Sequence, residues 1–82
     1  MEVLGLKVGS HGQPVRKWQN FLRDLKIPLD QSSKALDRIF GQGTRQGTEV
    51  YQKSKQLAET GVVDAETYAV AVLDGFNESV ET

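Results

Sequence analysis

The chain has 82 residues, a formal net charge of −1 and no cysteine, so it has room for one domain and cannot form disulfides, a thiolate nucleophile or a cysteine-based zinc site. Its hydrophobic residues make up 38% of the sequence and must gather in a single core for so short a chain to fold. No stretch approaches the roughly 20 apolar residues that cross a bilayer, and the first residues lack the apolar run of a secretory leader, so we expect no membrane partner and no signal peptide in this chain.

The charge is unevenly distributed along the chain. Every one of the 10 Lys and Arg residues lies at or before Lys55, and the charged residues that follow are all acidic. This asymmetry indicates either an anionic partner for the first part of the chain or attraction between a basic and an acidic helix within the fold.

The first predicted helix runs from about Gln13 to Lys26. Pro14 suits its first turn, where the missing N–H is not needed, and Pro28 ends it. Its apolar residues recur at helical spacing and predict a core-facing stripe: Val15, Trp18, Leu22 and Leu25. The polar connection that follows carries Leu29 and Leu36 as expected anchors to the core.

A second helix is predicted from about Gln42 to Leu57. Its inward face has little apolar bulk, since it consists of Thr44, Gly47, Thr48 and Tyr51. A third helix is predicted from Ala65 to Leu73, with Asp64 as N-cap and Gly75 closing it. We expect one domain over residues 1–75 and a tail or linker over residues 76–82.

An internal repeat relates the starts of the second and third helices. Residues 39–44, with the sequence IFGQGT, match residues 62–67, with the sequence VVDAET. Each unit has two apolar residues, a cap position and a Thr three residues later, which can bond in the first helical turn while its methyl group packs inward. The sequence therefore predicts an all-α fold with a duplicated helical unit.

These motifs closely resemble the peptidoglycan-binding-domain family, the three-helix module attached to wall-lytic amidases, muramidases and carboxypeptidases. The resemblance covers about Leu6 to Leu73 and rests on Leu6, Gly9-Ser10, Gly12, Val15, Gln19, Leu22, Asp37, Phe40-Gly41, Thr44, Tyr51-Gln52, Thr60-Gly61, Val63-Asp64 and Thr67.

The resemblance implies a small orthogonal three-helix bundle and non-catalytic binding of bacterial cell-wall peptidoglycan, through glycan or stem peptide. It further implies that the module targets an attached or associated wall hydrolase. We would then expect the domain in the cell wall, and in the periplasm or outside the cell if the protein is exported or released by lysis.

The chain departs from the family pattern at four places. Asp37-Arg38 stands where the family has Asp-Gly, so that loop is expected to take a different turn. Tyr68 replaces the usual Trp, Trp18 replaces Leu, and Gly47-Thr48 replaces Ala-Val. We hypothesise that the larger Trp18 fills the space released at Gly47.

Catalytic chemistry finds little support in the sequence. His11 lies near glycines without a second His or any Cys, which predicts an exposed turn residue and no metal site. Asp37 and Asp64 could form a carboxylate pair, but a turn former and a helix cap explain them more simply. No serine has an identifiable base, so we expect no enzyme activity and no cofactor.

Binding residues are expected around the helix starts. A domain that binds peptidoglycan needs an aromatic platform, hydrogen-bonding groups and a cation that pairs with carboxylates. The candidates are Asp37, Arg38, Gln42, Arg45 and Tyr68. Trp18 and Tyr51 are instead expected in the core, and Gln19 and Gln52 are expected to tie loop backbone by hydrogen bonds.

Two other functions remain open. The same fold could serve as a protein-interaction or autoinhibitory module. A helix-turn-helix nucleic-acid binder is the weaker alternative, because the sequence has no dense Arg/Lys stripe on one helix, and we expect no nucleic acid.

Overall fold

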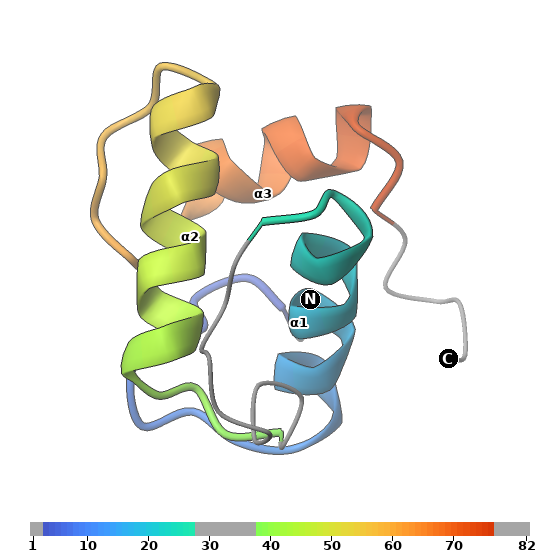
Figure 1. The fold of residues 1–82 in the computed structure, drawn as a ribbon, viewed down its shortest axis with the longest axis vertical. Helices are drawn as coiled ribbons and strands as arrows, with labels where there is room; N and C mark the ends of the chain where they lie inside the picture. The colour runs from blue at the N-terminus through green and yellow to red at the C-terminus, as the bar shows by residue number, and fades with distance from the viewer. Residues whose placement is uncertain (1–2, 28–37, 77–82) are drawn as a thin grey trace.

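The computed structural model describes residues 3–27 and 38–76 and contains three helices within them. They are α1 (Gln13–Asp24), α2 (Gln42–Ser54) and α3 (Ala65–Leu73). Figure 1 shows α1 and α2 running upright beside one another, with α3 crossing near their upper ends. The described residues form no strand beyond one isolated bridge between His11 and Ile39. The prediction of an all-α, orthogonal three-helix bundle is confirmed.

The helix starts agree with the prediction, but two of the helix ends do not. We expected α1 to reach Lys26 and α2 to reach Leu57, whereas they end at Asp24 and Ser54. The reason is a left-handed residue after each helix, with φ of 63° at Lys26 and 61° at Gln56. The third helix ends as predicted, with Gly75 at φ 105°.

Each helix closes with the same pair of backbone bonds. After α2, the Leu57 N–H donates to the Gln52 carbonyl (2.8 Å) and the Gln56 N–H donates to the Lys53 carbonyl (3.1 Å). This 6→1 and 5→2 pattern is the Schellman motif, and it recurs after α1 and α3. A lysine and a glutamine thus occupy positions that glycine usually takes, which is why the sequence did not reveal these two ends.

An aromatic cluster forms the centre of the core. Trp18 is fully buried, and its ring centroid lies 5.4 Å from that of Phe21, 5.9 Å from that of Tyr51 and 5.7 Å from that of Phe76. The predictions that Trp18 and Tyr51 are core residues are confirmed. Phe76, where we expected a tail or linker to begin, is buried in this cluster. Residues 77–82, the rest of that tail, lie outside the described residues.

The segment before α1 links the starts of α2 and α3. The Phe40 N–H donates to the Ser10 carbonyl and the Val63 N–H donates to the Leu6 carbonyl, each at 2.9 Å. Phe40 and Val63 are equivalent positions of the predicted repeat, so the N-terminal segment pairs in the same way with both repeats. This pairing fixes the loops that lead into α2 and α3.

Candidate functional site

A buried glutamine on α1 holds the loop that leads into α2. Gln19 Nε2 donates to the Ile39 carbonyl at 3.1 Å and to Thr44 Oγ1 at 2.9 Å. Its Oε1 accepts the Arg38 backbone N–H at 3.3 Å. One side chain therefore binds three points of the loop and of the first turn of α2.

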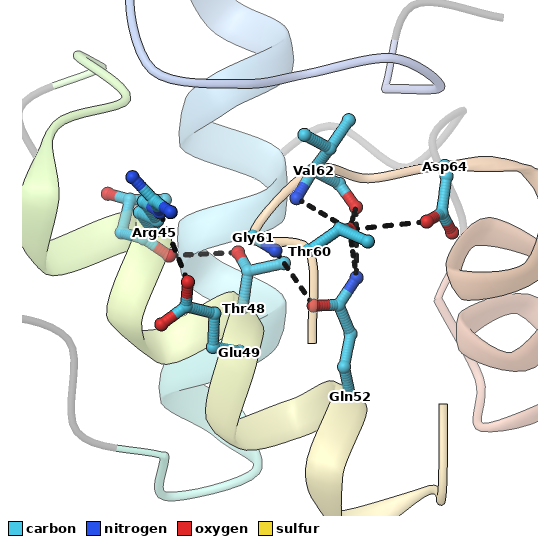
Figure 2. A network of polar contacts seen from close by, with 9 residues as sticks. Arg45, Thr48, Glu49, Gln52, Thr60, Gly61, Val62 and Asp64 are labelled. Atoms are coloured by element: carbon cyan, nitrogen blue, oxygen red, sulfur yellow. Dashed lines mark hydrogen bonds and ion pairs between the residues drawn. The ribbon is translucent and has the colours of Figure 1, made fainter. Parts of the chain in front are cut away.

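A second buried glutamine, on α2, holds the loop that leads into α3 (Figure 2). Gln52 Nε2 donates to the Val62 carbonyl at 3.0 Å, to Thr67 Oγ1 at 2.8 Å and to Thr60 Oγ1 at 3.1 Å. Its Oε1 accepts the Gly61 backbone N–H at 3.0 Å. The expectation that Gln19 and Gln52 tie down loop backbone is confirmed.

The two arrangements, which we call the glutamine clamps, match position for position. Each glutamine binds a backbone N–H, the carbonyl of the next residue and the hydroxyl of a Thr in the helix that follows. The residues they hold are the two units of the predicted repeat, residues 39–44 and 62–67. The structure thus supports a duplicated helical unit joined through side-chain hydrogen bonds.

Arg38 and Gly61 occupy the same place in the two clamps. Their φ angles are 67° and 72°, both in the left-handed region that favours glycine. We expected the loop to take a different turn because the family has Gly at the position of Arg38. For Arg38 itself that expectation is wrong, since its backbone adopts the glycine-like conformation.

The cap at the start of α3 is built as predicted. Asp64 Oδ1 accepts the Thr67 backbone N–H at 2.9 Å, and its Oδ2 lies 3.3 Å from Thr60 Oγ1. Partial burial alone would raise the pKa of Asp64, but the hydrogen bonds from Thr67 and Thr60 outweigh it and hold the pKa below its usual value. Asp64 is therefore an ionised cap at the positive end of α3.

The expected binding residues occupy different surroundings. Arg38 and Gln42 are exposed before and at the start of α2. Arg45 Nε pairs with Glu49 Oε2 at 3.1 Å, and its side chain lies so close to Gly61 that a Cβ there would meet Arg45 Cγ at 2.7 Å (Figure 2). Arg38, Gln42 and Arg45 thus lie along the first half of α2 and the loop before it.

Tyr68 lies apart from that group. Tyr68 is half-buried on α3, with its ring centroid 6.3 Å from that of Phe76 at the edge of the aromatic cluster. Its ring is therefore partly a core element. Asp37 lies outside the described residues.

A polar cluster that sequence reasoning missed lies at the end of α2. The Tyr51 hydroxyl donates to Asp74 Oδ2 at 2.6 Å, and Lys55 Nζ lies 2.9 Å from the same oxygen. Burial, reinforced by the neighbouring Asp74 carboxylate, raises the pKa of the Tyr51 hydroxyl and keeps it protonated. The hydrogen bond from Tyr51, followed by that from Lys55, lowers the pKa of Asp74.

The same cluster lines a cavity of about 340 Å³. Its walls come from the ends of all three helices, and its lining residues are Leu25, Ile27, Tyr51, Ser54, Lys55 and Asp74. The cavity forms only because the ends of the three helices lie close together in the fold.

The described residues contain no cluster of candidate metal ligands. Within residues 3–27 and 38–76, no group of three or more His, Cys, Asp or Glu side chains could hold a metal ion. His11 is exposed, as predicted, but it pairs with Ile39 in the isolated bridge and is not a turn residue. In the part of the chain that is described, no helix is long and apolar enough to cross a membrane.

A small helical module with duplicated loop clamps, an open cavity and exposed cations has the features of a binding domain. The family model described as "Putative peptidoglycan binding domain" matches residues 11–70, and the chain belongs to this family. It is a peptidoglycan-binding module, and its family associates it with the cell wall. The resemblance inferred from the sequence motifs is confirmed.

The fold is also found in a solved structure, "The crystal structure of SleB N-terminal domain". The match has a TM-score of 0.73 at 23% sequence identity and covers 84% of this chain and 89% of that chain. At this identity the likeness establishes the fold. A search of the curated proteins finds no match to the chain.

Proposed function

We propose that this domain targets a wall hydrolase, attached or associated, to its substrate by binding peptidoglycan without taking part in catalysis. The observation that carries the proposal is the family match over residues 11–70, which includes both glutamine clamps. A module this small offers limited contact area, so each binding event is expected to be weak. Repeated sites along the polymer would then supply avidity.

The contact surface that we propose includes the first half of α2. Arg38 and Arg45 carry cations that suit the free carboxylates of stem peptides, and Gln42 adds an amide between them in sequence. All three are exposed, and Gln19 holds the Arg38 backbone and the Thr44 side chain of the same segment. Asp37 would support this surface, and Tyr68 would add an aromatic edge on α3.

This surface makes the salt dependence of binding a direct test. Exposed charge pairs weaken as ionic strength rises, so co-sedimentation with purified sacculi should decrease between low and high salt. The Arg38→Gln, Arg45→Gln double variant should bind less and lose most of that dependence. Arg23→Gln is the matched control, because Arg23 is exposed on α1 away from these residues. Salt-independent binding by the unaltered domain would contradict a role for the arginines.

A second candidate function has one observation in its favour. Val72 and Leu73, at the end of α3, are 47% and 86% exposed, which suits docking against another protein. In that case a defined protein partner would co-purify with the domain and Leu73→Lys would abolish the association, while sacculi would fail to bind.

A further inference from the structure

The cavity at the helix ends is built from equivalent positions of the three helices. Leu25, Lys55 and Asp74 are the C-cap residues of α1, α2 and α3, and all three line it. Each helix closes with a Schellman motif, so the positions of these residues are fixed by backbone bonds. The volume of about 340 Å³ lies within the range of small-ligand sites, about 300–1,000 Å³.

The polar groups of the cavity are held in place before any ligand arrives. Asp74 Oδ2 receives the Tyr51 hydroxyl at 2.6 Å and Lys55 Nζ at 2.9 Å. Lys55 has two further N–H donors, and the Asp74 carboxylate has further lone pairs. The cavity therefore offers a hydrogen-bond donor next to an acceptor, with little side-chain ordering needed on binding.

The remaining wall is apolar, and the charges cancel. Leu25 and Ile27 supply aliphatic surface from the end of α1. Because Lys55 and Asp74 are paired, a ligand with a net charge would gain one attraction and suffer one repulsion at similar distances. The cavity thus suits a neutral group that has a methyl, an N–H donor and a carbonyl acceptor.

We propose that this cavity binds the acetamido group of an N-acetylhexosamine in the glycan strand. The methyl group packs on Leu25 and Ile27, the carbonyl accepts from Lys55, and the N–H donates to Asp74. The proposal rests on the proposed function, which supplies the polymer, and it assigns glycan recognition to a face other than the first half of α2. An alanine residue in a stem peptide has the same three features, so the test must separate these two sources.

The direct test is an NMR titration of the full chain with a tetramer of N-acetylglucosamine. Cellotetraose is the matched control ligand, because it has the same linkage and a hydroxyl in place of each acetamido group. We expect the backbone amide signals of Leu25, Ser54, Lys55 and Asp74 to shift with the first ligand and not with the second. N-formyl-alanine amide, which keeps the alanine methyl, N–H and carbonyl but has no acetyl group, serves as the peptide arm and should leave these signals in place.

Variants then connect the shifts to the named side chains. Lys55→Met keeps the aliphatic stem and removes the donor, and it should weaken binding of the tetramer about tenfold. Leu25→Ala should weaken binding severalfold through the lost methyl contact. Lys53→Met is the control, because Lys53 is exposed on the same helix outside the cavity and should bind as the unaltered chain does. Unchanged signals far from the cavity would show that each variant is folded.

The outcomes separate this inference from the proposed function. Shifts confined to other faces, equal shifts with cellotetraose, or a stronger response to the alanine amide would each overturn acetamido binding here. If the unaltered chain still sediments with sacculi in any of those cases, the proposed function stands and only the cavity assignment falls. If the tetramer shifts the cavity signals but sacculi do not retain the chain, the cavity assignment holds and wall targeting is wrong.

Discussion

Gln52 Nε2 lies 2.8 Å from Thr67 Oγ1, and this contact joins α2 to the first turn of α3. Gln19 and Thr44 join α1 to α2 through the same pair of atoms at 2.9 Å. Both glutamines are almost completely buried, so each clamp replaces the water that would otherwise solvate the loop backbone. The junction of α1 with α2 and the junction of α2 with α3 thus depend on the same arrangement of hydrogen bonds.

The clamps should be among the most costly positions to alter. Gln52→Met keeps the volume but leaves the Gly61 N–H without its acceptor and removes the donor to the Val62 carbonyl and the Thr67 hydroxyl, so we expect a loss of about 3 kcal/mol in the free energy of unfolding. Urea denaturation measures it. Gln46→Met, at an exposed position on the same helix, is the control and should change stability by less than about 0.5 kcal/mol. Equal midpoints for both variants would contradict the clamp's role.

Arg38 and Gly61 should respond in opposite directions to substitution. Arg38→Gly relieves a left-handed backbone and should stabilise the chain. The gain is limited to about 1 kcal/mol, because glycine also gains entropy in the unfolded state, which opposes folding. Gly61→Ala should destabilise it by more than about 1 kcal/mol, because its φ is 72° and its Cβ would meet Arg45 Cγ at 2.7 Å. Thermal melting decides the signs. A destabilised Arg38→Gly variant would refute the strain at that position.

A third prediction concerns the packing of Trp18 against Gly47. Gly47 is buried in α2 next to Thr48, whose Oγ1 accepts the Trp18 indole N–H at 2.9 Å. Helix propensity alone would make Gly47→Ala more stable by about 1 kcal/mol. If Trp18 fills the space at Gly47, the added methyl should instead lower the melting temperature. A rise in melting temperature would rule out this compensation.

The polar cluster of Tyr51, Lys55 and Asp74 should make the stability of the fold depend on pH, with a loss of stability in acid. The hydrogen bond from Tyr51, with that from Lys55, lowers the pKa of Asp74, so folding favours the ionised carboxylate. Its contribution is present above the unfolded pKa of about 3.9 and is lost as the pH falls through the lower folded pKa. The melting temperatures of the unaltered chain and of Asp74→Asn should therefore differ at pH 7 and converge in acid. A constant difference would contradict the linkage, and Asp24→Asn, on the exposed end of α1, provides the control.

Local signals in the sequence were enough to predict where the helices begin. Pro14 in the first turn of α1 and Asp64 as the cap of α3 act within a few residues, so their effects could be read directly. The ends of α1 and α2 could not, because Lys26 and Gln56 adopt φ angles that their residue types rarely take. The Schellman bonds that close the two helices hold these residues in that conformation against the preference of their residue types.

The glutamine clamps could be predicted from the sequence, whereas the cavity could not. Gln19 and Gln52 each follow a core aromatic residue, and the repeat suggested that they act alike. The cavity needs Leu25, Lys55 and Asp74 to meet from three helices, and no spacing in the sequence encodes that meeting. Phe76 was missed for a similar reason, since only the folded chain shows that Trp18 and Phe21 receive its ring.

Co-sedimentation of the purified chain with bacterial sacculi tests the central claim most directly. We predict that the chain pellets with intact sacculi in proportion to their amount. It should return to the supernatant after a muramidase dissolves them. A chain that stays in the supernatant at every sacculus load, at low salt and while folded, would contradict peptidoglycan binding.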